Sequence, residues 1–491
     1  MIGERTAPLL VTADWDGNVF SGGWRAASGG SADVTDKSTD AVLARVGVAS
    51  AEDVAQACRR AAAAAPAWAR TPASERAAIL ARAADELGAA EAELLPWLMR
   101  ETGCVAPKAR REIDVARHEL HEAAQLCEHE ARRVVELGPD AESVAIRVPL
   151  GVVGIITPWN FPLILAMRSV APALALGNTV VLKPDLQTTV TGGFVIAAAL
   201  ARAGLPDGVF HVLPGDAEPG AALTADPNVA MISFTGSTAV GRLVGASAGA
   251  SLKRVALELG GNSPLIVLDD ADVELASSGG AFGSFFHQGQ ICMAASRHLV
   301  HESVAPRYVA RLVERANRLS VGDPCASQAA LGPLINDEQL RRVRDVVERS
   351  VAAGASVAAG ATAEGRFYRP TVLTGVTPAM PAFTDEIFGP VAPVTTFRSD
   401  DEAVALANET EYGLSSAIYS ADVARAAAIA ERLRSGMVHI NDQTVNDDAR
   451  VPFGGFGASG NGGRFGSVSN VEEFTTWRWM TVREHGHAYP F

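Results

Sequence analysis

Cysteine is scarce in this sequence, and its distribution excludes a disulfide framework. The five cysteines, Cys58, Cys104, Cys127, Cys292 and Cys325, are scattered over 491 residues and include no Cys-x-x-Cys pair. An odd number of isolated cysteines is typical of proteins from a reducing compartment. We therefore expect a cytoplasmic protein with free thiols.

Basic residues are outnumbered by acidic ones, which excludes a large class of partners. The chain has 42 Lys and Arg against 56 Asp and Glu, and a net charge of −14. Binding to a phosphate backbone requires a basic surface, so we expect no nucleic-acid partner. No run of like charge is long enough to indicate a disordered arm.

Long uninterrupted apolar runs are also absent. Between Arg147 and Asp185 the only charged residues are Arg168 and Lys183, but prolines interrupt this stretch. The prolines are Pro149, Pro158, Pro162 and Pro172. A membrane helix needs about 20 consecutive apolar residues, and the N-terminus lacks the pattern of a secretory signal. We expect no membrane association, and interpret the stretch as a buried strand, turn and helix.

Apolar residues make up 48% of the chain, enough for a large core, and the length predicts about three domains. The first half of the N-terminal region reads as helices. A capping box at Ser50 and Asp53 opens one helix, and a Thr-Pro pair at position 71 opens a second. Residues 132–149 predict a β-hairpin with its turn at 138–140.

Strands and helices alternate in the middle of the chain. The segments "GVVGII", "TVVL", "VFHVL" and "VAMISF" predict strands, with helices at 163–176 and 192–203 among them. Such alternation is typical of βαβ units and a parallel sheet covered on both faces. A second α/β pattern begins after Glu258 and continues to about Asn441. We therefore predict an α/β fold, with the hairpin and a late strand at Phe474–Val482 forming a small appendage.

Polar residues stand at the ends of several predicted strands. Asn160 lies between two prolines after the first strand, as a rigid oxyanion-hole donor or as a plain turn residue. Glu258 ends an apolar strand before two glycines, as a general base or as a structural ion-pair partner. The segment "FTGSTAVG" at 234–241 opens a helix, where free backbone N–H groups bind a phosphate or merely form a turn.

Cys292 stands in "FFHQGQICMAAS", a stretch without acidic or strongly basic residues. A thiol in this setting is a core residue, a metal ligand or a nucleophile, and the pattern alone does not decide between them. Two further motifs match functional patterns but lack the context that those patterns require, so we assign them no function. The Gly-x-Ser-x-Gly pattern around Ser247 lies at a predicted helix end rather than after a strand, and the GxGxxG pattern at 455–460 has no strand before it.

Three histidines and a cysteine lie near one face of a predicted helix. They are His118, His121, His129 and Cys127. Glutamates surround them and the spacing matches no known metal site, so we interpret a solvated helix face and expect no metal.

Seven segments follow one another in the order known from one protein family. They are "PWNFP", "VVLKPD", "FTGST", "LELGG", "GQICMAASR", "EIFGP" and "PFGGFGASG". In this order they resemble the signature segments of the NAD(P)-dependent aldehyde dehydrogenase superfamily, over nearly the whole chain. The neighbouring text, such as "NFPLILAMRSVAPALALGN", "KPDLQT" and the ending "YPF", looks most like the benzaldehyde dehydrogenase branch.

The resemblance implies a reaction and a role for each polar residue. Cys292 is the implied nucleophile, which forms a thiohemiacetal with an aldehyde while the Asn160 amide and the Cys292 N–H hold the oxyanion. Hydride transfer to NAD or NADP leaves a thioester, and Glu258 activates the water that releases the acid. The branch implies an aromatic, benzaldehyde-like aldehyde as the partner molecule.

The resemblance also assigns residues to the cofactor and the substrate. The implied cofactor residues are Trp159, Lys183, Gly236, Ser237, Glu386 and Phe388. The apolar residues that flank the implied site, and are expected to line the substrate pocket, are Phe161, Leu165, Ile291 and Met293. An apolar pocket separates close analogues by only about 1–3 kcal/mol per methylene, so these residues do not name the aldehyde.

The family fold implies three domains in a homodimer or homotetramer. A Rossmann-like dinucleotide-binding domain is implied at 1–131 and 150–257, and a second α/β domain, the catalytic one, at 258–445. The hairpin at 132–149 and the tail at 470–491 form the implied oligomerisation appendage.

Two positions depart from the family pattern. Leu186 stands three residues after Lys183, where many NAD-preferring relatives carry a glutamate, and its apolar side chain makes NADP more tolerable. Arg464 stands near the place of a second glutamate, so we assign no proton relay to that place.

Other functions compatible with these residues remain as alternatives. They are a CoA-acylating, semialdehyde or aliphatic aldehyde dehydrogenase of the same superfamily and, more remotely, a cofactor-free thiol esterase built on Cys292 and Glu258. CoA-dependent relatives often lack the base, so Glu258 favours hydrolysis of the thioester.

Overall fold

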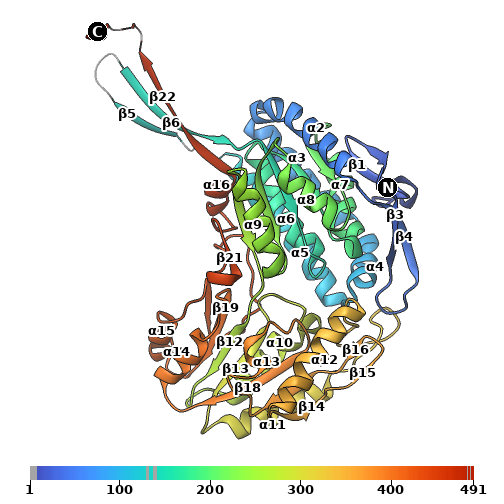
Figure 1. Ribbon diagram of the computed structural model, residues 1–491, viewed down its shortest axis with the longest axis vertical. Helices are drawn as coiled ribbons and strands as arrows, with labels where there is room; N and C mark the ends of the chain where they lie inside the picture. Colours follow the sequence, from blue (N-terminus) through green and yellow to red (C-terminus); the bar gives the residue numbers. More distant parts are fainter. Residues whose placement is uncertain (1–7, 129–131, 137–140, 484, 487) are drawn as a thin grey trace, which may run out of the picture.

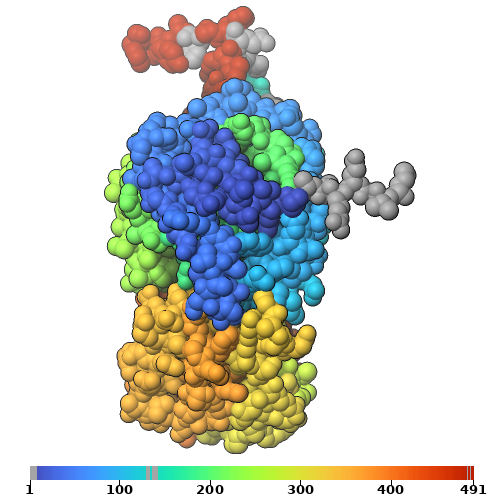
Figure 2. Space-filling view, turned by 90° about the vertical axis from the view of Figure 1, so that its right-hand side faces the viewer, coloured from blue at the N-terminus to red at the C-terminus, as the bar shows by residue number. Residues whose placement is uncertain are grey.

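Two large sheets and a projecting arm organise the chain (Figure 1). The structure is a computed structural model that describes residues 8–128, 132–136, 141–483, 485–486 and 488–491. An eight-stranded sheet forms the upper body, a seven-stranded sheet forms the lower body, and a three-stranded sheet stands out from the upper body as the arm. Figure 2 shows the N-terminal segments lying over the upper body, with the arm clear of both bodies.

The eight-stranded sheet is parallel at its centre and antiparallel at both edges. Its strands are, in order, β2 (Trp24–Ala26), β1 (Asn18–Ser21), β9 (Phe210–Val212), β8 (Thr179–Lys183), β7 (Val152–Ile156), β10 (Val229–Thr235), β11 (Arg254–Glu258) and β21 (Gly460–Asn461). The five central strands confirm the predicted parallel alternation. The antiparallel edges differ from it, because β1 and β21 arrive from the two distant ends of the chain.

Eight helices of eight or more residues pack in the described part of this upper body. They are α2 (Ala51–Arg70), α3 (Ala73–Ala89), α4 (Glu91–Thr102), α5 (Ala106–Leu126), α6 (Pro162–Ala175), α7 (Val195–Arg202), α8 (Ala217–Ala225) and α9 (Thr238–Ala250). All residues of β7 and α6 are buried, which confirms the interpretation of the apolar stretch. The predicted capping box is also confirmed, since the Asp53 amide donates to Ser50 Oγ and the Ser50 amide donates to Asp53 Oδ2.

The helical interpretation of the N-terminal region is wrong before Ser50. The described residues of that part, 8–49, contain one short helix, α1 (Thr12–Trp15), and strands β1 and β2 together with the ribbon of β3 (Ser31–Thr35) and β4 (Val42–Gly47). Aromatic and β-branched residues there alternate with glycine, serine and aspartate, which favours short strands and turns. Strand β1 adds to the eight-stranded sheet by pairing antiparallel with β9.

The seven-stranded sheet of the lower body is parallel except at one edge, where β14 runs antiparallel to β17. Its strands are, in order, β14 (Ser356–Ala359), β17 (Thr371–Thr374), β18 (Val391–Phe397), β13 (Ala295–His301), β12 (Ser263–Val267), β19 (Ser415–Tyr419) and β20 (Met437–Ile440). Its helices are α10 (Val273–Phe285), α11 (Ala305–Arg318), α12 (Asp337–Ala352), α13 (Pro381–Thr384), α14 (Asp400–Asn408) and α15 (Val423–Ala430). A small hairpin joins β15 (Ala363–Glu364) to β16 (Phe367–Tyr368). The second α/β pattern is thereby confirmed.

The arm is the predicted appendage of separated segments. The late strand β22 (Thr475–Arg483) pairs along its whole length with β6 (Ala141–Pro149), which in turn pairs with β5 (Arg132–Glu136). The short helix α16 (Ser469–Phe474) leads into β22. The turn expected at 138–140 lies outside the described residues. Within the described ranges, no helix combines the length and apolar character that crossing a membrane requires.

Candidate active site

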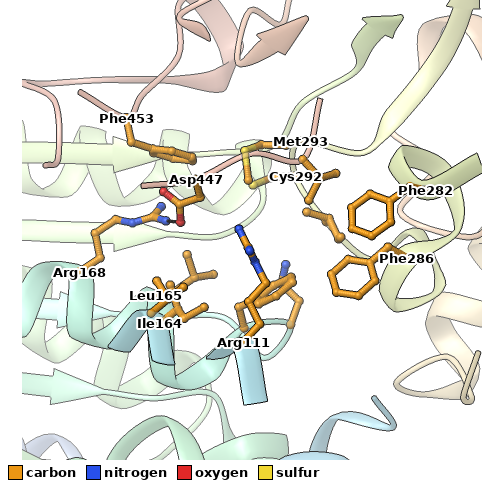
Figure 3. Close-up of a pocket in the computed structure, with 15 residues that line it drawn as sticks. Arg111, Ile164, Leu165, Arg168, Phe282, Phe286, Cys292, Met293, Asp447 and Phe453 are labelled. Atoms are coloured by element: carbon orange, nitrogen blue, oxygen red, sulfur yellow. Dashed lines mark hydrogen bonds and ion pairs between the residues drawn. The ribbon is translucent and has the colours of Figure 1, made fainter. Parts of the chain in front are cut away.

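Cys292 lies where two cavities meet. One cavity has mainly apolar and aromatic walls (Figure 3), and it is lined by Arg111, Val115, Asn160, Phe161, Ile164, Leu165, Arg168, Phe282, Phe286, Ile291, Cys292, Met293, Val445, Asp447 and Phe453. The other opens towards the ends of the parallel strands, and it is lined by Pro158, Trp159, Asn160, Leu165, Thr235, Gly236, Ser237, Leu259, Gly260, Cys292, Gln339, Arg342, Glu386 and Phe388. Only Asn160, Leu165 and Cys292 line both. The thiol is therefore accessible from either side.

The loop that carries Cys292 is held rigidly from both bodies. It follows the 3-10 turn Phe286–Gly289, in which His287 and Gln288 have left-handed backbone angles of φ 50° and 57°. The Gln288 side chain donates to the carbonyls of Gly103 and Pro333 at 3.1 and 2.8 Å. A Cβ at Gly261 would lie 2.3 Å from the Cys292 carbonyl oxygen, so the close approach of the two loops requires glycine there.

Asn160 is buried beside this loop, and its Nδ2 donates to the Gln290 carbonyl at 3.0 Å. Helix α6, which follows Asn160, is fixed at its start by the Glu112 side chain on α5. Glu112 Oε1 accepts from the Leu163 amide at 2.9 Å, satisfying a donor of the first turn of α6. Lys108 forms a fully buried ion pair with Glu112 and places its ammonium 4.3 Å from the centre of the Phe161 ring. The amide of Asn160 therefore starts from a preorganised position.

Glu258 ends β11 and is only 5% exposed. Burial raises the pKa of its carboxyl to about 8, against the positive charges of Arg168 and Arg464. Among the described residues, nothing hydrogen-bonds to its Oε2 atom. A carboxylate with this pKa is a competent proton acceptor near neutral pH.

Burial also raises the pKa of the Cys292 thiol, to about 12. The Arg168 guanidinium opposes this shift, while the nearby carboxylates of Glu386 and Glu258 add to it. The thiol is therefore protonated near neutral pH, and its use as a nucleophile requires removal of the proton by a base.

A cleft of about 690 Å³ continues from Cys292 along the carboxyl ends of the parallel strands, where α/β sheets bind ligands. Its walls include Trp159, Lys183, Gly236 and Ser237. Glu386 and Phe388 line the smaller cavity that joins it to the sulfur. Glu386 is buried and accepts from the Gly261 amide at 3.0 Å.

The sequence profile of the aldehyde dehydrogenase family matches residues 24–480. The chain belongs to this family. A vanillin dehydrogenase from an Amycolatopsis species is 55% identical over 98% of this chain and 100% of that protein. An NAD(+) benzaldehyde dehydrogenase from Pseudomonas putida is 52% identical over 97% of this chain and 98% of its own length. The structure of a salicylaldehyde dehydrogenase from Pseudomonas putida G7 complexed with salicylaldehyde has a TM-score of 0.93, with 34% identity, over 96% of this chain and 99% of that one.

The structure of this aldehyde dehydrogenase corrects one detail of the phosphate turn. The amide of Gly236 is not free, because it donates to the Glu258 carbonyl at 3.0 Å and extends the pairing of β10 with β11. The donors at the start of α9 begin with Ser237, whose Oγ accepts from the Val240 amide at 3.4 Å.

Several residues of the dehydrogenase site were not singled out by its sequence. Arg168 forms an ion pair with Asp447, lies 3.9 Å from Glu119 and places its guanidinium 4.0 Å from the centre of the Phe453 ring. Figure 3 shows this pair on one wall of the aromatic cavity. The sequence did contain a signal for Arg168, because it is a single arginine in an otherwise apolar helix. Asp447 and Phe453 lie in an irregular segment, where no pattern indicates the partner.

The remaining motifs do not form the sites that their patterns would suggest. In the part of the chain that the structure describes, no three His, Cys, Asp or Glu residues are grouped as metal ligands; His129 lies outside that part. A nucleophile elbow requires a strand directly before its serine, but Ser247 lies within α9. This agrees with the interpretation that Ser247 is not a nucleophile. The glycines at 455–460 form a loop with a 3-10 turn at Gly457–Ser459.

Proposed function

We propose that this dehydrogenase oxidises aromatic aldehydes to carboxylic acids, with NAD+ as the electron acceptor. The observation that carries the proposal is the position of Cys292, between an aromatic cavity and a long cleft at the ends of the parallel strands. The names of the relatives support it, since they include vanillin, benzaldehyde and salicylaldehyde dehydrogenases.

The first half of the reaction uses the sulfur and the amide beside it. The Cys292 thiol gives its proton to solvent, the sulfur adds to the aldehyde carbon, and the oxygen of the thiohemiacetal accepts from Asn160 Nδ2 and the Cys292 N–H. Glu258 is not consumed in this half and stays free to accept a proton later. A nicotinamide cofactor in the cleft would supply the hydride acceptor, and Lys183, Ser237 and Glu386 are among the residues that would hold it. Once the former aldehyde carbon is oxidised, Cys292 carries the acyl group as a thioester.

The second half releases the product. Glu258 removes a proton from water, whose oxygen adds to the thioester carbon while the same donors hold the oxyanion. The carbon–sulfur bond then breaks, the acid leaves, and the sulfur is ready for another cycle. The carboxyl pKa of about 8 suits a group that must both take up and give up a proton.

The walls of the substrate cavity favour an aromatic ring. Four phenylalanines from three segments line it, Phe161, Phe282, Phe286 and Phe453, and the rings of Phe282 and Phe286 stack at 4.7 Å. The charged residues Arg168 and Asp447 neutralise each other, but no ion-pair partner of Arg111 exists among the described residues. Arg111 is exposed and lines the same cavity, which favours rings that carry a phenolic hydroxyl.

The charges beside Lys183 favour NAD+ over NADP+. Asp185 and Asp216 line the cleft with Lys183, and both carboxylates raise the pKa of its ammonium against the lowering effect of burial. A 2′-phosphate placed near them would meet two negative charges. These aspartates supply the negative charge that Leu186 does not.

The test is a panel of aldehydes, each supplied with NAD+ and with NADP+. We expect kcat/KM for benzaldehyde and 4-hydroxybenzaldehyde to exceed that for a long aliphatic aldehyde or succinic semialdehyde by at least about 10-fold, and NAD+ to be preferred. Reduced nicotinamide is followed by absorbance at one fixed pH for all substrates. Preference for the aliphatic substrates would contradict the aromatic proposal, and acyl-CoA formed on addition of CoA would contradict hydrolysis.

Replacing Asn160 by alanine tests the oxyanion donor. We expect kcat to fall by about 10²- to 10³-fold, the usual cost of losing one such donor, with little change in cofactor affinity. The exposed Asn228→Ala variant serves as the matched control. A kcat close to that of the wild type for Asn160→Ala would contradict the assigned role.

We also propose that the three parts of the chain act as in the family fold, with 1–131 and 150–257 binding the cofactor and 258–445 supplying the nucleophile. The arm, 132–149 and 470–491, would join subunits of a homodimer or homotetramer. Its strand β22 leaves apolar side chains exposed, Trp479 at 72%, and exposed apolar edges of this kind favour pairing. Five free cysteines support a cytoplasmic location.

A further inference from the structure

We propose that Arg464, on a segment anchored by Glu473, is a positioning residue that favours the ionised form of the Glu258 side chain and orients it for release of the acid. This inference rests on the proposed function, because it concerns the base of that reaction.

Arg464 and Glu258 meet over a glycine. A Cβ at Gly454 would lie 2.9 Å from Glu258 Oε1, 2.5 Å from Arg464 Cδ and 3.0 Å from Arg464 Nε. Since 2.9 Å and 3.0 Å are measured to the same point, Oε1 and Nε are at most 5.9 Å apart. Any larger residue at position 454 would displace one side chain or the other, so glycine there permits the two groups to approach.

The segment that carries Arg464 is fixed on both sides. Gly460 pairs with Glu258 where β21 meets β11, which joins the segment to the strand of the base. Arg464 Nη1 donates to the Gly463 carbonyl at 3.2 Å, and its guanidinium lies 5.1 Å from the centre of the Phe456 ring. The arginine therefore stands at a fixed place beside the carboxylate.

Glu473 anchors this segment from α16. Its Oε2 accepts from the Gly463 amide, and its side chain is buried. A Cβ at Gly463 would come within 2.1 Å of that oxygen, so a larger residue there would displace the carboxylate. The acid thus holds the backbone next to Arg464 and adds a negative charge to the surroundings of Glu258.

Four charged groups besides the thiol act on Glu258. Arg168 from α6 and Arg464 lower the pKa of its carboxyl, while Glu473 from α16 and Asp447 raise it. Arg168 is already engaged by Asp447 and Glu119. Among the described residues, Arg464 forms no ion pair within 4.0 Å, so its charge is not shared in a direct contact.

Removing the charge of Arg464 and removing the charge of Glu473 should shift the pKa of Glu258 in opposite directions. Without the Arg464 charge, the ionised form of Glu258 loses stabilisation and its pKa rises. Without the Glu473 charge, a repulsion is removed and the pKa falls. Release of the acid requires the ionised base, so the first change moves the rise of the rate to higher pH and the second to lower pH.

The experiment compares Arg464→Met, Arg464→Lys and Glu473→Gln with the wild type between about pH 6 and pH 10. Benzaldehyde and NAD+ are the substrates, and both the burst of reduced cofactor and the steady rate are recorded. We expect Arg464→Met to retain the burst, to raise the apparent pKa of the steady rate and to lower that rate about 10-fold at neutral pH, as one pKa unit predicts. Arg464→Lys should restore the wild-type profile, and Glu473→Gln should shift it to lower pH.

Two outcomes would overturn the inference. One is a set of superimposable pH profiles, and the other is a shift of both Arg464→Met and Glu473→Gln in the same direction, which would indicate general loosening of the loop. If Arg464→Met does not fold, the direction of the shift in Glu473→Gln still decides. A wild-type protein that oxidises no aldehyde would instead refute the proposed function.

Discussion

Replacing Cys292 by alanine should lower the rate of aldehyde oxidation by at least about 10⁴-fold, because a covalent intermediate cannot form without the sulfur. NAD+ binding should change little, since the cleft retains its walls at Lys183 and Ser237. The measurements are reduced-nicotinamide formation with benzaldehyde and cofactor affinity by calorimetry.

The chain offers a matched control for this variant. Cys325 is a free and exposed cysteine in the lower body, so Cys325→Ala removes a thiol without touching either cavity. It should oxidise benzaldehyde like the wild type. Turnover in Cys292→Ala at the level of Cys325→Ala would show that the oxidation does not pass through the sulfur.

Replacing Glu258 by glutamine should separate the two halves of the reaction. The amide is nearly isosteric but accepts no proton, so the thioester should accumulate and the steady rate should fall by about 10²- to 10⁴-fold. A rapid-mixing experiment should record one equivalent or less of reduced cofactor, followed by near arrest. Intact-protein mass spectrometry of the arrested enzyme should find the acyl group on Cys292.

The pH dependence gives a second readout of Glu258. In the wild type, the steady rate should rise with pH, reach half of its maximum near pH 8 and level off about one pH unit higher, because the base acts only when its carboxyl is ionised. Glu258→Gln should lose that rise. The surface variant Glu75→Gln should keep both the rate and the profile, and full steady turnover by Glu258→Gln would assign the base to another residue.

The sequence allowed the central strands to be placed with little error, because a buried parallel strand reads as a short apolar run between turn residues. β7, β8 and β10 were all found in this way. The strands before residue 50 were missed because they are short and their pairing is not local to one pattern. β1 pairs with the edge of a sheet built from distant segments, β2 pairs with β1, and β3 and β4 form a separate ribbon. Their burial is decided by tertiary packing and not by local pattern.

In the candidate site too, the residues beside strand ends could be predicted, and those that depend on tertiary packing could not. Asn160 and Glu258 were singled out because they stand next to strand ends, and the structure places Asn160 beside Cys292. Arg168 and Phe453 are separated by a long stretch of chain, and their contact depends on how an irregular segment folds back over α6. A pairing of that kind leaves no periodic trace in the sequence. The engaged amide of Gly236 is likewise visible only when β10 and β11 are paired.

The sulfur of Cys292 stands in a wall shared by two otherwise separate cavities, and this makes the enzyme modular. Residues such as Phe282 and Phe453 line only the aldehyde side, while Glu386 and Phe388 line only the cofactor side. Substitutions at Phe282 or Phe453 can therefore change which aldehydes bind without altering the residues on the cofactor side. Evolution or an engineer can thus vary what is oxidised independently of how the oxidation is carried out.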